Sequence, residues 1–110
     1  HADAAAVNVN FWITPDAATL DPDHGGLIVW NRKAPREWNF EEYNDQRKEP
    51  EILAWLEQQG AETITVPYRE NRALIFNSDL FHKSDQCRFR DDYESRRINL
   101  TLLYGRRGEA

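Results

Sequence analysis

Residues 7–14, with the sequence VNVNFWIT, alternate between apolar and mainly polar side chains. Val7, Val9 and Phe11 fall on one face of an extended chain, and Asn8 falls on the other. A period of two is typical of a β-strand that buries one of its faces. The pattern therefore predicts a strand at the start of the chain.

Further apolar runs, separated by turn-forming residues, predict more short strands and one helix. The expected strands cover residues 27–30, 62–68, 72–76, 80–82 and 97–104. A helix over 50–59 is favoured because Pro50 suits a first helical turn and Gly60 stands where a left-handed residue commonly ends a helix. Residues 31–43 and 86–95 are polar and are interpreted as loops. Short strands with turn-rich connections favour a β-sandwich or barrel with a helical insertion.

The length and composition narrow the class of protein. With 110 residues the chain has room for one small domain, which we place at residues 1–105 with a frayed tail at 106–110. A net charge of −5 argues against a nucleic-acid partner, and no run approaches the about 18 apolar residues of a membrane span. Cys87 is the only cysteine, so no internal disulfide can form. We expect a cytoplasmic protein with no membrane partner.

The three histidines bear on possible metal chemistry. His1 and Asp3 form an H-x-D pair, whose side chains project to the same face of an extended backbone. His82 follows a long apolar run and supplies a second imidazole. Two histidines and one carboxylate form the facial triad of non-haem Fe(II) oxygenases. The pair alone also fits a capped chain end, and His24, in a Gly/Asp turn, is interpreted as an exposed loop histidine.

Arg97 favours the metal-site interpretation. Eight of the eleven arginines lie within residues 69–107, which fits either a solvated surface or an anion-binding pocket. Alternation along the last strand places Arg97 and Thr101 on one face, and a guanidinium beside a metal can clamp a carboxylate through two hydrogen bonds. The competing interpretation is an ion pair of Arg97 with Glu94 or Asp92.

Taken in order, these motifs resemble the 2-oxoglutarate/Fe(II)-dependent oxygenases, and more narrowly their prolyl-hydroxylase-like and phytanoyl-CoA-hydroxylase-like branches. The matching segments are His1-x-Asp3, VNVNFWIT-P-D, GGLIVW, NSDLFH ending at His82, and RINL beginning at Arg97. The resemblance implies a mainly β fold, the double-stranded β-helix (a cupin-like jelly roll), with one short helical insertion.

The same resemblance implies a function and a set of site residues. The chain would be a dioxygenase that hydroxylates a small-molecule or peptide substrate, using Fe(II), O2 and the cosubstrate 2-oxoglutarate. His1, Asp3 and His82 would bind the metal, and Arg97 would hold the distal carboxylate of 2-oxoglutarate. The polar residues expected to assist in cosubstrate binding are Thr101, Asn10 and Asn8.

The chain departs from the family at its start. It contains no Met and begins on the first metal ligand, whereas family members usually carry a helical layer and a strand before the H-x-D. We therefore expect the β-helix to be incomplete at the N-terminus, metal occupancy to be poor, and the Val7, Val9 and Phe11 face to be uncovered. A homodimer would cover these surfaces.

Three alternatives stay open. The chain could be a cupin-like metal- or ligand-binding module without redox chemistry, or His1 could chelate copper through its imidazole and amine. A group of aromatic residues could form a flap over the substrate or pack the helix onto the sheet; its members are Trp30, Trp38, Phe40 and Tyr43.

Overall fold

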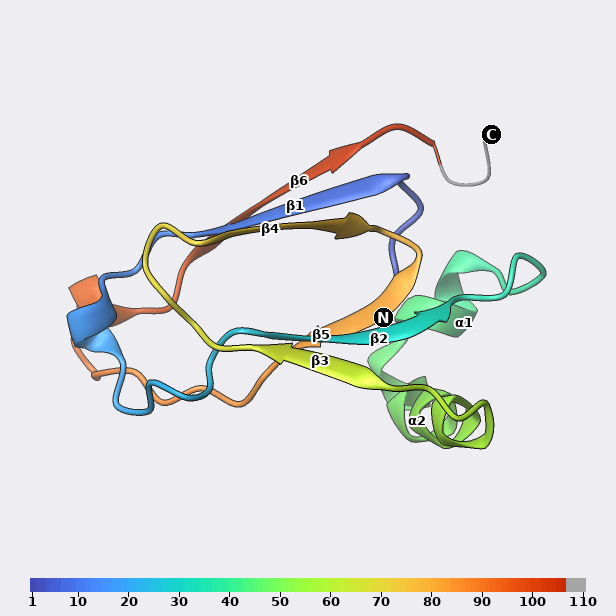
Figure 1. Cartoon of the computed structure of the whole chain (residues 1–110), viewed down its shortest axis with the longest axis horizontal. Coiled ribbons are helices and arrows are strands. Elements are labelled where there is room, and N and C mark those ends of the chain that lie inside the picture. Colours follow the sequence, from blue (N-terminus) through green and yellow to red (C-terminus); the bar gives the residue numbers. More distant parts are fainter. Residues whose placement is uncertain (107–110) are drawn as a thin grey trace.

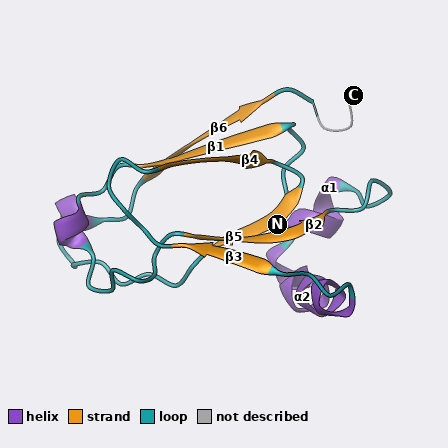
Figure 2. Ribbon diagram, viewed as in Figure 1, coloured by secondary structure: helices purple, strands orange, loops and turns teal. Residues whose placement is uncertain are grey.

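Six strands form two antiparallel sheets in residues 1–106, the part of the chain that the computed structural model describes (Figures 1 and 2). The first sheet has the order β4 (Ala73–Asn77), β1 (Val7–Trp12), β6 (Asn99–Tyr104). The second has the order β3 (Thr63–Val66), β2 (Leu27–Lys33), β5 (Leu80–Ser84). The mainly β class is thereby confirmed, with every expected strand present. The strands β1, β3 and β6 are shorter than the pattern suggested, and β2 and β5 are longer. Of the expected tail, residues 107–110 lie outside the described part of the chain.

The helical insertion lies between β2 and β3 and contains α1 (Phe40–Asn44) and α2 (Glu49–Gln58). Short 3-10 turns cover Asp16–Ala18, Gln46–Lys48 and Tyr93–Ser95. Pro50 lies in the first turn of α2, and Gly60 adopts a φ of 66° just after it, as the sequence predicted. The predicted loop over 31–43 is wrong at both ends, because β2 continues to Lys33 and α1 begins at Phe40. The side chain of Asn39 accepts a hydrogen bond from the Glu42 backbone, a local cap that starts α1.

The interior face of β1 carries its polar residues. Asn8, Asn10 and Trp12 are buried, whereas the odd-numbered positions are only partly buried. The register places Val9 opposite both Ile75 of β4 and Leu102 of β6. The apolar side of this sheet therefore points away from the second sheet, and the space between the sheets receives two buried asparagines.

Two apolar clusters hold the molecule together. Trp12, Leu27 and Tyr68 form the cluster between the sheets, and the rings of Trp12 and Tyr68 stack at 5.3 Å between centroids. The second cluster packs α2 onto the β3-β2-β5 sheet; its buried residues are Ala2, Ala34, Tyr43, Ile52, Leu56 and Phe81. This contiguous packing fixes the insertion, and with it one wall of the candidate site.

The aromatic residues of the insertion serve mainly as packing. Trp38 contacts Trp55 and Phe81, with ring centroids 5.0 Å and 6.1 Å away. Trp30 packs against the same cluster, and the side chain of Phe40 is not among those described. Packing of the helices onto the sheet is thus the interpretation that the structure supports over a flap.

No helix within residues 1–106 has the length and apolar character needed to cross a lipid bilayer.

Candidate functional site

The first three residues lie beside the start of β5. The backbone N–H of His82 donates to the carbonyl of His1 over 2.8 Å, and that of Asp3 donates to the carbonyl of Ser78 over 2.8 Å. On the other side, Nδ2 of Asn44 in α1 donates to the carbonyl of Ala2 over 2.7 Å. The H-x-D segment is therefore held between a strand and the helical insertion, next to the terminus marked N in Figure 1.

His1, Asp3 and His82 form one cluster in which each residue offers a ligand atom within 4.8 Å of the others. The rings of His1 and His82 meet edge to face at 4.4 Å between centroids. His82 is buried, Asp3 is half-buried and His1 is exposed, so the cluster opens toward solvent on the His1 side. The structure thus brings together the three residues that the sequence proposed as metal ligands.

The tautomer of His82 is set by its surroundings. Its Nδ1 lies 2.8 Å from the carbonyl oxygen of Leu80, which can only accept a hydrogen bond, so Nδ1 carries the proton. Nε2 then faces Oδ2 of Asp3 at 3.2 Å. Two lone pairs at that distance repel each other unless a cation, a proton or a metal ion, lies between them. The donor set and its orientation therefore fit a divalent metal ion.

Asn8 supports Asp3 from the floor of the site. Its Nδ2 donates to Oδ2 of Asp3 over 3.2 Å, while its Oδ1 is buried with no hydrogen-bond partner within the described residues. Burial raises the pKa of the Asp3 carboxyl, but the hydrogen bonds from His82 and Asn8 and the positive charge nearby outweigh it, so the net pKa is lowered. Asp3 is therefore held as a carboxylate, the form that binds metal.

Arg97 reaches the interior from the segment just before β6. Its Nε donates to the carbonyl of Gly25 over 2.5 Å, and a terminal nitrogen donates to the carbonyl of Gly26 over 3.2 Å. The guanidinium carbon lies 6.0 Å from the ring centroid of Trp12 and 5.7 Å from that of Tyr68. Burial lowers the pKa of Arg97, which nonetheless stays charged at neutral pH. These contacts replace the alternative ion pair with Glu94 or Asp92.

A line of polar side chains runs from Arg97 along β6 to β1, and its members on β6 are exposed. Arg97 donates to Oδ1 of Asn99, whose Nδ2 donates to Oγ1 of Thr101 over 3.0 Å. Nδ2 of Asn10 also donates to Oγ1 of Thr101, and Oδ1 of Asn10 accepts from Trp12. Thr101 and Asn10 thus meet across β6 and β1, and Asn8 lies two positions further along β1, at the metal cluster.

Sequence reasoning missed part of this site. Asn99 shares the face of Arg97 and Thr101, so the period-two pattern placed it correctly without assigning it a role. Gly25 and Gly26 belong to the GGLIVW segment, to which no binding role was given, yet their carbonyls accept hydrogen bonds from Arg97. A Cβ at position 26 would lie 1.8 Å from the carbonyl oxygen of Val66, so only glycine fits there. The adjacent glycines just before a strand were the available signal.

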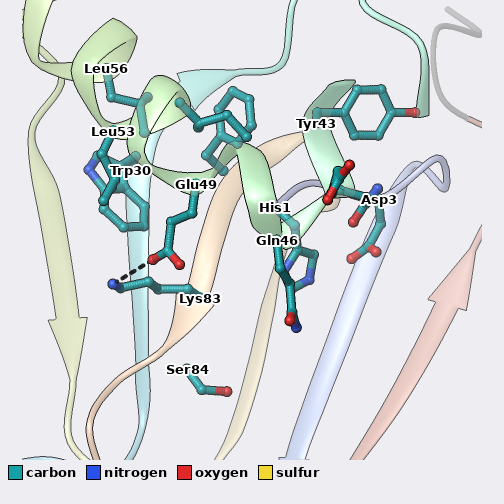
Figure 3. A pocket seen from close by; sticks show the side chains of 14 residues that line it. His1, Asp3, Trp30, Tyr43, Gln46, Glu49, Leu53, Leu56, Lys83 and Ser84 are labelled. Atoms are coloured by element: carbon teal, nitrogen blue, oxygen red, sulfur yellow. Dashed lines mark hydrogen bonds and ion pairs between the residues drawn. The ribbon is translucent and has the colours of Figure 1, made fainter. Parts of the chain in front are cut away.

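A cavity of about 780 Å³ adjoins the cluster on the side of the helical insertion (Figure 3). His1 and Asp3 line one end, and Trp30, Leu53 and Leu56 line the other. The volume is within the range of small-molecule sites. A ligand in this cavity would lie next to the candidate metal ligands.

Two other residues with reactive side chains lie apart from the cluster. His24 pairs with Asp21 at 2.8 Å and is partly exposed, in keeping with a loop histidine. Cys87 is exposed and unbridged, and no function is assigned to it.

No protein-family model, curated protein or solved structure matches this chain.

Proposed function

We propose that this chain carries the site of a non-haem Fe(II)- and 2-oxoglutarate-dependent oxygenase, which hydroxylates a small-molecule or peptide substrate on a double-stranded β-helix. The observation that carries the proposal is the orientation of His82, whose Nδ1 faces the Leu80 carbonyl and whose Nε2 faces the Asp3 carboxylate at 3.2 Å with the His1 ring alongside. Two imidazoles and one carboxylate on one side of an ion leave the opposite positions free for other ligands.

His1, Asp3 and His82 would hold the metal, which when bound supplies the activation of O2 and the oxidation of a substrate C–H bond. Each of the other contacts prepares these ligands. The Leu80 carbonyl fixes the His82 tautomer, and Asn8 fixes the rotation of the Asp3 carboxylate. Such outer contacts orient metal ligands and raise their affinity.

Arg97 would bind the distal carboxylate of 2-oxoglutarate. Its guanidinium now donates to two backbone carbonyls, and a carboxylate is a stronger acceptor that can replace them through two parallel hydrogen bonds. Trp12 and Tyr68 lie within 6.0 Å of the guanidinium and keep water from that side. The hydroxyl of Thr101 and the amide of Asn10 would bond to the cosubstrate. The support for this is that hydrogen bonds link both residues to Arg97 through Asn99.

The proposal is tested by adding 2-oxoglutarate and Fe(II), the metal in excess because poor occupancy is expected, to the protein under anaerobic conditions and recording the visible absorption. A weak charge-transfer band is expected only when both bind at one metal. The His82→Ala variant should lose the band at every cosubstrate concentration, and Arg97→Met should need at least about tenfold more 2-oxoglutarate. His24→Ala is the matched control and should leave the band unchanged.

Each result has one meaning. Absence of the band in the unmodified protein would contradict the proposal. Metal binding that depends on His82 but not on 2-oxoglutarate would favour the alternative, a cupin-like metal-binding module.

A further inference from the structure

The cavity beside the metal cluster has a wall whose charge is mainly negative. Three of its lining residues are carboxylates, Asp3, Asp45 and Glu49, and Lys83 is its one lysine or arginine. Asp3 belongs to the metal cluster. Asp45 is occupied by Arg47, which donates to it from its backbone, from Nε and from a terminal nitrogen. Glu49 is therefore the carboxylate of the wall that is left to bind a ligand.

The contact that holds Glu49 is exchangeable. Nζ of Lys83 lies 3.1 Å from its Oε1, and both side chains are about half exposed, at 51% for Glu49 and 41% for Lys83. Ion pairs with this exposure contribute about 0–1 kcal/mol. Lys83 thus shows that an alkylammonium fits against Glu49, and a second ammonium can take its place at little cost.

Apolar side chains adjoin Glu49 on the side away from the metal cluster (Figure 3). Leu53 is 36% exposed and Trp30 is half-buried, so both present surface to the cavity rather than to the core alone. Behind them Ile52 and Leu56 are buried and close the wall. A ligand that contacts both Glu49 and this wall needs a cationic group joined to an aliphatic chain.

We propose that the cavity binds a primary aliphatic amine as its ammonium ion, with the nitrogen on Glu49 and the alkyl chain on Trp30 and Leu53. This inference rests on the proposed function, and it makes such amines the substrate class of the oxygenase. An anionic ligand is disfavoured because Lys83 is already paired, the other charged side chains of the wall are carboxylates, and the terminal ammonium of His1 already donates to the carbonyl of His82. A free amine and the side chain of a peptidyl lysine share this chemistry.

The test follows the methyl NMR signals of Ile52, Leu53 and Leu56 during titration with n-hexylamine near neutral pH, without metal or 2-oxoglutarate. Saturable shifts are expected with n-hexylamine and not with n-hexanol or hexanoate at equal concentration. Glu49→Gln should weaken binding about tenfold. Lys83→Gln should tighten it severalfold, because it removes the competing ammonium. Glu57→Gln, on α2 but outside the cavity, should leave the affinity unchanged. A short lysine peptide with a blocked N-terminus then distinguishes a free amine from a peptidyl lysine as ligand.

Equal shifts with n-hexanol, or unchanged affinity in Glu49→Gln, would overturn the proposal. If Glu49→Gln fails to fold, the affinity of Lys83→Gln for n-hexylamine decides alone. An affinity equal to that of the unmodified protein would also overturn the proposal. Because metal is absent throughout, the absorption experiment tests the oxygenase proposal separately.

Discussion

Asn8 donates a hydrogen bond to the carboxylate of Asp3, while its own carbonyl oxygen is buried without a hydrogen-bond partner among residues 1–106. Asp3 precedes β1 and Asn8 lies within it, where Asn8 is only 1% exposed. A buried acceptor without a partner costs free energy, and in native proteins it commonly marks a functional site. A hydrogen-bond donor on a ligand bound at the candidate metal site would satisfy Oδ1.

Replacing Asn8 with leucine should therefore weaken metal binding more than it weakens the fold. Leucine has nearly the same shape but cannot fix the Asp3 carboxylate, and loss of such a contact typically lowers metal affinity about 10- to 100-fold. Titration with Mn(II), followed by electron paramagnetic resonance, measures the change. Asn77→Leu, on the outer face of β4, is the control and should bind Mn(II) like the unmodified protein. Unchanged affinity in Asn8→Leu would rule out a supporting role.

Gly26→Ala should destabilise the protein strongly. The added Cβ would lie 1.8 Å from the Val66 carbonyl oxygen and 2.9 Å from the Trp12 ring, so the backbone of two strands must move. We expect a loss of about 3 kcal/mol in the free energy of unfolding, measured with urea. Gly60→Ala is the comparison, because its φ of 66° is strained for alanine but no atom lies within 4 Å. Its loss should be about 1–2 kcal/mol. Equal losses would show that crowding at position 26 is not the cause.

Tyr68 should make stability fall at alkaline pH. Burial raises the pKa of its hydroxyl, which donates to the Thr14 carbonyl over 2.6 Å. Because the folded pKa exceeds the unfolded one, the stabilising contribution is fully present below about pH 10 and is lost as the pH rises through the folded pKa. Between these pH values the free energy of unfolding should fall more steeply in the unmodified protein than in Tyr68→Phe. Tyr93→Phe, at an 82% exposed position, should not change the slope. Parallel slopes for all three proteins would contradict the assignment.

The outer face of the β4-β1-β6 sheet should mediate self-association, in line with the expected homodimer. Ile75 is 72% exposed, and Leu102, opposite Val9 on the same face, is 40% exposed. Apolar faces of this kind commonly mark interfaces. Sedimentation velocity over a range of concentrations should show dimers of the unmodified protein and monomers of Ile75→Lys. Ile64→Lys, at a 67% exposed position of β3, is the control and should still dimerise. A monomer at every concentration would show that this face does not pair copies of the chain.

The sequence placed β1 and α2 accurately because each has a strong local signal. Alternation over residues 7–14 is a period-two pattern, and Pro50 with Gly60 brackets a helix. The boundary of β2 was less predictable, since Asn31 to Lys33 are polar and join the strand only through their neighbours. Asn31 accepts a hydrogen bond from the backbone of Glu62, a contact that no local pattern reveals.

The sequence by itself determined the residue types of the candidate site and their order, because an imidazole, a carboxylate and a guanidinium are defined by the side chains alone. The tertiary structure decided which of them meet. Asp3 and His82 approach to 3.2 Å because β5 pairs with the start of the chain through backbone hydrogen bonds. The tertiary structure also decided which face of β1 is interior, because a period-two pattern shows that the two faces differ but not which of them is buried. Packing of Trp12 against Tyr68 and Leu27 turns the asparagine face of β1 inward and leaves its valines on the outer face. The inward asparagines therefore adjoin the candidate site.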